Sequence, residues 1–149
     1  MIRGYFSTEG KRQRPFVEAV FRFAPSNEEF NVPLLVDTGA DRTILAPIDA
    51  LRLALDFDVD LTKFEQGPPS TGVGGPATTR IVQTVLRIDA FETPLQLTIL
   101  EPASSGRISP IPSLLGRDVI SRFGLFIDQC TNRVLLLEKE EVGKLPFLV

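Results

Sequence analysis

The chain has 149 residues and contains no histidine. Without an imidazole it cannot build a Ser-His-Asp triad, a Cys-His pair, an HExxH zinc site or a histidine proton relay. Its one cysteine, Cys130, excludes an intrachain disulfide and a paired-cysteine metal site. With no histidine base available, Cys130 is interpreted as a structural thiol. Carboxylates are therefore the leading candidates for any acid-base chemistry.

Other features that the sequence lacks limit which partners the protein can have. No segment approaches the ~20 apolar residues of a membrane span, and the first residues lack the apolar run of a secretory signal. Sixteen basic and nineteen acidic residues leave a formal charge of -3, so no basic surface for nucleic acid or for an anionic membrane is indicated. We therefore expect a cytoplasmic protein whose partners include neither nucleic acid nor a membrane.

Most of the sequence shows the residue patterns of short β-strands. A composition of 43% hydrophobic and 23% charged residues fits one globular domain spanning residues 1–149. Apolar residues alternate or run together in short segments bounded by proline, glycine and asparagine, which is typical of strands. These segments are residues 14–23, 32–36, 80–88, 95–99, 125–127 and 134–137. Two short helices are predicted, at residues 47–53 and 116–123, so the fold class is mainly β.

Two weak motif matches do not support a cofactor or a metal. Residues 72–77 fit a loose GxGxxA dinucleotide pattern, but that motif must open a helix, and the alternation at 80–88 predicts a strand. Residues 56–60 resemble the start of a calcium loop, yet Leu61 and Gly67 stand where glycine and glutamate are needed. We predict neither a cofactor nor a metal site.

The strongest motif is the sequence LLVDTGADRTIL at residues 34–45. An apolar strand delivers the Asp37 carboxylate to its end, and Gly39 permits a sharp change of direction there. Thr38 places a hydroxyl beside the acid. Strand ends often carry ordinary Asp-x-Gly turns, but the length of the whole string argues against that interpretation.

With this motif and two others, the sequence resembles the retroviral-type aspartic proteases, the single-lobed retropepsin-like family. The second motif is a glycine-rich stretch at residues 72–75, where the family has its flap hairpin. The third is LLGRD at residues 114–118, which ends 81 residues after Asp37 and resembles the family's late signature before a short helix. The resemblance implies a closed acid-protease β-barrel with one or two short helices and a glycine-rich flap hairpin.

The resemblance also implies the chemistry and the assembly. Such enzymes hold a water between two aspartates that share one proton, because like charges so close do not both ionise. This chain contains a single Asp-Thr-Gly sequence. The second catalytic aspartate must come from another copy, so we expect a homodimer that cleaves peptide or protein substrates in extended segments, with one Asp37 from each chain.

Further roles follow residue by residue from the resemblance. Thr38 would hydrogen-bond across the dimer axis. Gly39, Ala40 and Asp41 would contact the substrate, Gly39 through its carbonyl and Asp41 in the neighbouring subsite. Arg117 would form a structural ion pair with Asp41. Substrate contacts are also expected from the flap residues Val73, Gly74 and Gly75, although an ordinary hairpin turn remains an equal interpretation of that stretch.

The sequence departs from the viral pattern in two places. An insertion is expected around residues 53–66, because 37 residues separate Asp37 from the flap glycine Gly74. The strand pattern at 134–137 and the apolar tail at 145–149 extend beyond the point where viral enzymes end, which leaves the dimer interface open. Two alternatives therefore stand beside the protease: a catalytically silent module for dimerisation or peptide binding, and a monomer activated by a partner.

Overall fold

A closed β-barrel forms the centre of the computed structural model, which describes residues 1–8, 12–24, 26–72, 75–102 and 110–147. Six strands follow one another around it, and pairing of the first with the last closes the ring. In spatial order they are β3 (Arg14–Phe23), β4 (Glu28–Val36), β11 (Leu114–Leu115), β5 (Ile44–Leu45), β10 (Phe91–Leu100) and β9 (Thr79–Ile88). The short strands β2 (Tyr5–Ser7) and β6 (Glu65–Gln66) extend the sheet beyond β3 and β9.

The alternation in the sequence sets which faces are buried. In β3, Val17, Ala19 and Phe21 are at most 1% exposed, while Glu18 between them is exposed. In β10, Leu97 and Ile99 are fully buried. Side chains of successive strand residues point to opposite faces, so these strands line one shared core. The mainly-β prediction and the closed barrel are confirmed.

Near the middle of the barrel, β11 lies between β4 and β5. It runs parallel to β4, with Leu114 opposite Leu35, and antiparallel to β5, with Leu114 also opposite Ile44. The chain therefore leaves β4, makes a loop over residues 37–43, and returns as β5 on the other side of β11. This interleaving brings the two most specific sequence motifs, LLVDTGADRTIL and LLGRD, into direct contact.

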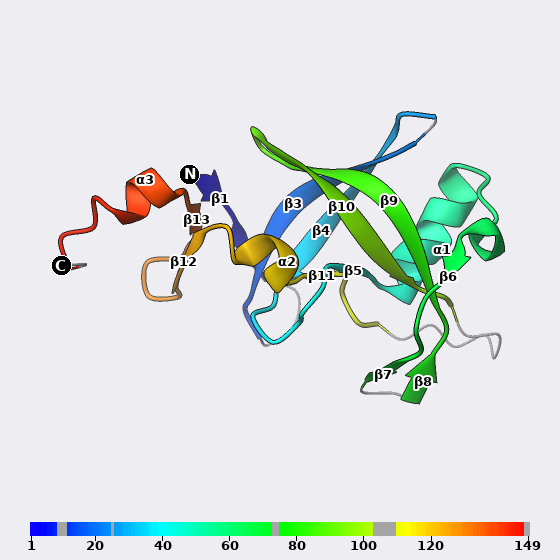
Figure 1. Cartoon of the computed structure of the whole chain (residues 1–149). Coiled ribbons are helices and arrows are strands. Elements are labelled where there is room, and N and C mark those ends of the chain that lie inside the picture. Colours follow the sequence, from blue (N-terminus) through cyan, green and yellow to red (C-terminus); the bar gives the residue numbers. More distant parts are fainter. Residues whose placement is uncertain (9–11, 25, 73–74, 103–109, 148–149) are drawn as a thin grey trace.

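One end of the barrel is covered by α1 (Pro47–Asp56), which is followed by the 3-10 turn η1 (Leu61–Lys63) (Figure 1). Pro47 occupies the first turn, where its missing N–H costs no helical hydrogen bond. The Ser113 hydroxyl donates to Asp49 Oδ2 at 2.6 Å and accepts from the Ala46 N–H at 2.8 Å, which ties the helix start to β11. Residues 53–66, where an insertion is expected, form the second part of α1, then η1 and β6.

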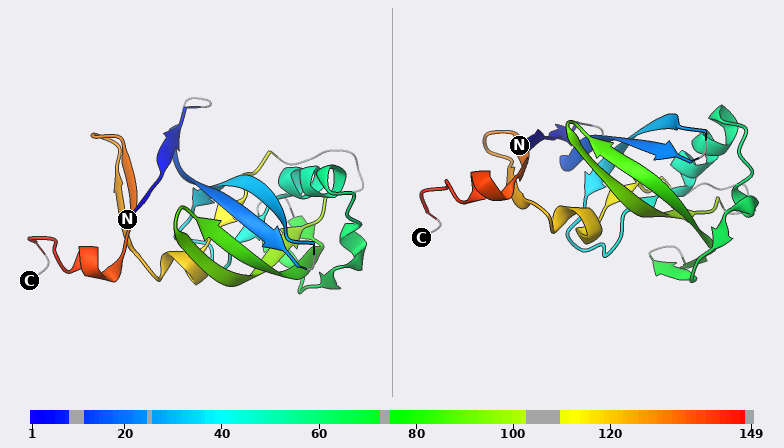
Figure 2. Two further views of the ribbon diagram at one scale, coloured as in Figure 1. Left: turned by 90° about the horizontal axis from the view of Figure 1, so that it is seen from above. Right: turned by 45° about the horizontal axis from the view of Figure 1, so that its top comes forward.

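The opposite end carries a separate sheet built from the two ends of the chain. Its order is β1 (Ile2–Arg3), β13 (Arg133–Leu137) and β12 (Gly124–Asp128). The short helix α2 (Arg117–Ile120) leads from the barrel to β12, and α3 (Lys139–Val142) follows β13. Figure 2 shows from two further directions that this terminal sheet lies beyond the end of the barrel, away from α1. Within the described residues, no helix is long and apolar enough to cross a membrane.

The sequence pattern predicts two helices but not α3, which has four residues and is too short to show an apolar period. The glycine-rich stretch forms a hairpin of β7 (Ser70–Gly72) and β8 (Gly75–Ala77), with Gly72 opposite Gly75. It projects from the barrel at the lower right of Figure 1. Two of the predicted flap residues, Val73 and Gly74, lie outside the described residues.

Candidate active site

Asp37 follows the last residue of β4, at the start of the loop over residues 37–43. Its N–H donates to the Leu115 carbonyl at 3.1 Å, which continues the β4–β11 ladder by one residue. Its Oδ1 accepts the Gly39 N–H at 2.8 Å, and the Asp37 carbonyl accepts the Ala40 N–H at 3.3 Å. The carboxylate is therefore held by its own turn, and the half-buried side chain keeps access to solvent.

The far side of this loop is joined to α2 through the backbone. The Arg117 N–H donates to the Ala40 carbonyl at 2.8 Å, and the Asp118 N–H donates to the Asp41 carbonyl at 3.2 Å. The first N–H groups of a helix have no partner within the helix. Here the loop carbonyls serve as their acceptors, so the position of the loop is fixed by α2.

Thr43 and Asp118 form a second connection beneath the loop. Asp118 accepts the Thr43 N–H on Oδ2 at 2.9 Å and the Thr43 hydroxyl on Oδ1 at 2.7 Å. The same hydroxyl accepts the Gly116 N–H at 3.2 Å. Thr43 is fully buried and all of these polar atoms are paired. Since hydrogen bonds to a charged group are the strong ones, this network is the main polar anchor of the loop.

Gly116 is required here for space. Its φ of -95° is available to any residue. A Cβ on Gly116 would lie 2.4 Å from the Arg42 carbonyl carbon and 2.5 Å from its oxygen, and both are backbone atoms. The loop and the start of α2 therefore approach each other more closely than a side chain permits.

Arg117 contacts the loop from its exposed side. Its guanidinium forms an ion pair with Asp41 and lies 3.5 Å from the Thr38 carbonyl. The ion pair that the resemblance implies is thus present, but it lies at the surface, with 56% of the Arg117 side chain and 79% of the Asp41 side chain exposed. Exposed pairs contribute little to the stability of a fold, so this pair orients the loop.

The structure gathers most of the predicted site residues in one place. Asp37, Thr38, Gly39, Ala40 and Asp41 occupy consecutive positions of the loop, and Thr38, Gly39 and Asp41 are exposed. Of the predicted flap residues, Gly75 lies in the β7–β8 hairpin.

Sequence reasoning assigned no role to the residues that hold the loop from below. Gly116 and Asp118 are part of the LLGRD motif, but nothing local in the sequence indicates that Asp118 contacts Thr43, 75 residues earlier. Ser113, which fixes the start of α1, was also missed. In the part of the chain that the structure describes, no group of three or more Cys, Asp or Glu side chains is placed to hold a metal ion.

Solved structures with the same fold are aspartic proteases. The structure is similar to a retropepsin-like aspartic protease from Rickettsia conorii, with a TM-score of 0.58 and 20% identity, over 89% of this chain and 98% of that one. It is also similar to EIAV protease complexed with the inhibitor HBY-793, with a TM-score of 0.50 and 20% identity, over 77% of this chain and 92% of that one. No family model matches the sequence, and no curated protein matches it.

The closed barrel and the Asp37 loop together define the class of fold. This chain has the fold of the retropepsin-like aspartic proteases, and the resemblance drawn from the sequence is confirmed at that level.

Proposed function

We propose that the protein is a homodimeric aspartic endopeptidase. One observation carries the proposal: an intact Asp37-Thr38-Gly39 turn presents a carboxylate at the end of β4, and three sets of contacts from α2 and its flanks fix that turn.

The reaction requires two Asp37 side chains, one from each copy. With Oδ1 engaged by Gly39, Oδ2 is the atom we assign to the lytic water. One carboxylate is ionised and takes a proton from that water as its oxygen attacks the scissile carbonyl carbon. The other is protonated and donates to the carbonyl oxygen, which stabilises the charge that develops there. The carboxyl group that took the proton from water then gives it to the amide nitrogen, and the other carboxylate recovers a proton from a hydroxyl of the tetrahedral intermediate. The C–N bond breaks, and a carboxylic acid and an amine are released.

The substrate is proposed to be an extended peptide segment with apolar residues beside the scissile bond. Gly39, Ala40 and Asp41 are the loop residues assigned to its backbone and side chains, together with Gly75 of the hairpin and, from the resemblance alone, Val73 and Gly74. Closure of the hairpin over the peptide would exclude water from the reacting groups. Neither a cofactor nor a metal has a role in this chemistry.

The competing interpretation from the sequence is a catalytically silent module for dimerisation or peptide binding, which no observation in the structure favours. The two functions differ in their response to loss of the carboxylate. Asp37→Asn keeps the shape of the side chain and an oxygen acceptor for the Gly39 N–H, but removes the ionisable group. A silent module would bind peptides equally well with either residue.

The test is cleavage of a broad peptide library at mildly acidic pH by the wild-type chain and by Asp37→Asn. The proposal expects cleavage by the wild type, abolished in the variant and blocked by a statine-type inhibitor. If wild type forms a folded dimer that cuts nothing, the silent module replaces the protease. A folded monomer without activity would instead support activation by a separate partner.

A further inference from the structure

The terminal sheet has two edge strands, β1 and β12, and among the residues that the structure describes neither has a partner on its outer side. In the sheet order β1-β13-β12, the middle strand β13 is paired on both sides, whereas β12 is paired on one side only. With five residues, β12 is longer than each of the other strands that the structure describes at a sheet edge, namely β1, β2, β6, β7 and β8, which have two or three residues. An unpaired edge presents a row of N–H and C=O groups to any strand that docks beside it.

The composition of β12 offers no protection against such docking. Its sequence is Gly-Leu-Phe-Ile-Asp, without the lysine or proline that commonly blunts an exposed edge. Phe126 is 37% exposed and Ile127 is 42% exposed, two of the large apolar side chains that the fold leaves in contact with water. An apolar strand edge open to solvent is typical of a surface that is covered in the working protein.

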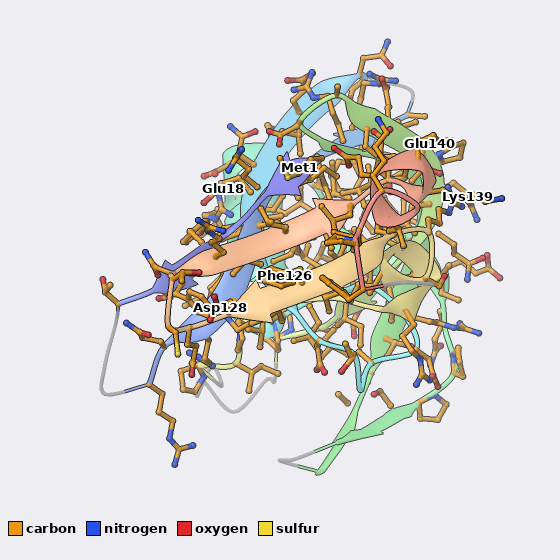
Figure 3. All side chains as sticks on the ribbon, turned by 90° about the vertical axis from the view of Figure 1, so that its left-hand side faces the viewer. Met1, Glu18, Phe126, Asp128, Lys139 and Glu140 are labelled. Atoms are coloured by element: carbon orange, nitrogen blue, oxygen red, sulfur yellow. The ribbon has the colours of Figure 1, made fainter. Side chains whose placement is uncertain are left out.

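The free edge of β12 faces the same side of the molecule as the candidate active site. Figure 3 looks onto the terminal sheet, with Phe126 and Asp128 labelled along β12. Below β12 in that view, and again in Figure 1, the cyan loop after β4 and the green β7–β8 hairpin extend in the direction that the free edge faces. A partner docked on this side would meet the strand edge and the Asp37 loop together.

A second copy of the chain would supply both a strand to pair with β12 and the second Asp37 that the proposed reaction requires. The second of these points rests on the proposed function. We infer that two copies associate by antiparallel pairing of β12 with the partner's β12, which joins the two terminal sheets into one continuous sheet of six strands with three from each copy. The same two-fold axis brings the two Asp37 loops together. The interface is isologous, because the same edge is used by both copies.

Self-complementarity favours a register centred on Phe126. The two Phe126 side chains then lie directly opposite each other, and Leu125 of each copy lies opposite Ile127 of the other, so apolar residues meet apolar residues. The only charged residue of β12, Asp128, falls opposite Gly124. The two Asp128 carboxylates are about 14 Å apart along the ribbon at 3.4 Å per residue, so like charges do not meet.

In this assembly the two ends of the chain pair with each other within one copy. Both end segments, β1 and β13, are already paired within one chain, and the Met1 amino group lies 3.0 Å from Glu141 of α3. Of the two edge strands of this sheet, β1 has two residues and β12 has five, so β12 offers the longer edge to a partner.

Disulfide trapping tests the register. Residues directly opposite in an antiparallel pair have Cα atoms about 4.5 to 5.5 Å apart, which lies within the range that a disulfide spans. In a Cys130→Ser background, Phe126→Cys should form a covalent dimer rapidly under mild oxidation. The matched control is Leu55→Cys in the same background, because Leu55 is a 73% exposed apolar residue on α1, at the opposite end of the barrel.

A second variant tests the surface without a new thiol. Ile127→Lys places a charge against the partner's strand and should raise the dimer dissociation constant at least about tenfold in sedimentation. Leu55→Lys should leave that constant unchanged. Circular dichroism spectra of both variants show whether the fold is retained.

The outcomes separate this inference from the proposed function. Rapid trapping of Phe126→Cys together with weaker association of Ile127→Lys supports the β12 interface, even if the dimer cleaves no peptide. A wild-type dimer in which Phe126→Cys is trapped no faster than Leu55→Cys overturns the interface while the protease proposal stands. A chain that stays monomeric at high micromolar concentration overturns both the interface and the homodimeric enzyme.

Discussion

Replacing Thr43 by valine tests the hydrogen bonds beneath the Asp37 loop. The two side chains have nearly the same shape, so the change removes one hydroxyl and leaves no cavity. That hydroxyl donates to Asp118 Oδ1 at 2.7 Å and accepts from the Gly116 N–H at 3.2 Å, and Thr43 is fully buried. The bond between the Thr43 N–H and Asp118 Oδ2 is unaffected, because it uses the backbone.

The expected loss follows from the two bonds. A hydrogen bond to a charged group contributes about 1.5 to 3 kcal/mol, and a buried N–H left without an acceptor costs about 1 to 3 kcal/mol. Allowing for relaxation of α2, we expect Thr43→Val to lower the free energy of unfolding by about 2 to 4 kcal/mol. With an m value of about 2 kcal/mol per M, the urea midpoint falls by about 1 to 2 M.

The assay is equilibrium urea unfolding at one fixed chain concentration, since association contributes to apparent stability. An Asp37→Asn background prevents digestion of unfolded chains by folded ones. The control is Thr98→Val, at a half-buried strand position where β-branched residues are favoured. If Thr43→Val unfolds within about 0.5 kcal/mol of its parent, as ordinary surface changes do, the network is not the anchor described here.

Three further changes test other parts of the structure. Gly116→Ala forces a Cβ against the backbone of Arg42, so it should lower the free energy of unfolding in urea by about 1 to 3 kcal/mol. It should also abolish peptide cleavage, and unchanged cleavage would show that the close approach is unnecessary. Arg117→Leu should change the free energy of unfolding by less than about 1 kcal/mol, because its ion pair is exposed. It should still reduce peptide cleavage, because the loop is held less firmly. A large loss of stability together with the loss of cleavage would contradict an orienting role. The Thr131 hydroxyl lowers the pKa of Asp128 below its ordinary 3.8, so the stabilisation is present at neutral pH and lost as the pH falls through that lowered pKa. Hydrogen exchange at β12 and β13 should therefore distinguish Thr131→Val from wild type near pH 7 but not near pH 2, and a difference that persists in acid would contradict this cause.

The strands and their buried faces can be predicted because they depend on residues that are close together in the sequence. Alternation along residues 14–23 fixed which face of β3 is buried, and its bounds are those of the predicted strand. The apolar run before Asp37 likewise predicted a strand that ends at the acid. β4 begins at Glu28, four residues before the predicted start, because three of those four residues (Glu28, Glu29 and Asn31) are polar.

The parts that escaped prediction depend on distant partners. Pairing of β3 with β9 closes the barrel, and pairing of β1 with β13 joins the two ends of the chain. Periodicity indicates which side of a strand is buried but carries no information about which strand lies beside it. The contact between Thr43 and Asp118 belongs to the same group, since a threonine and an aspartate far apart in the sequence give no local signal of their bond.

The central claim is that each active site uses one Asp37 from each of two chains. Mixing wild-type and Asp37→Asn chains under exchanging conditions, at constant total concentration, tests it most directly. If both carboxylates are required, activity follows the square of the wild-type fraction, and an equal mixture retains about one quarter of the activity of pure wild type. If each chain acts alone, activity falls linearly and the same mixture retains about one half, which would contradict the shared site.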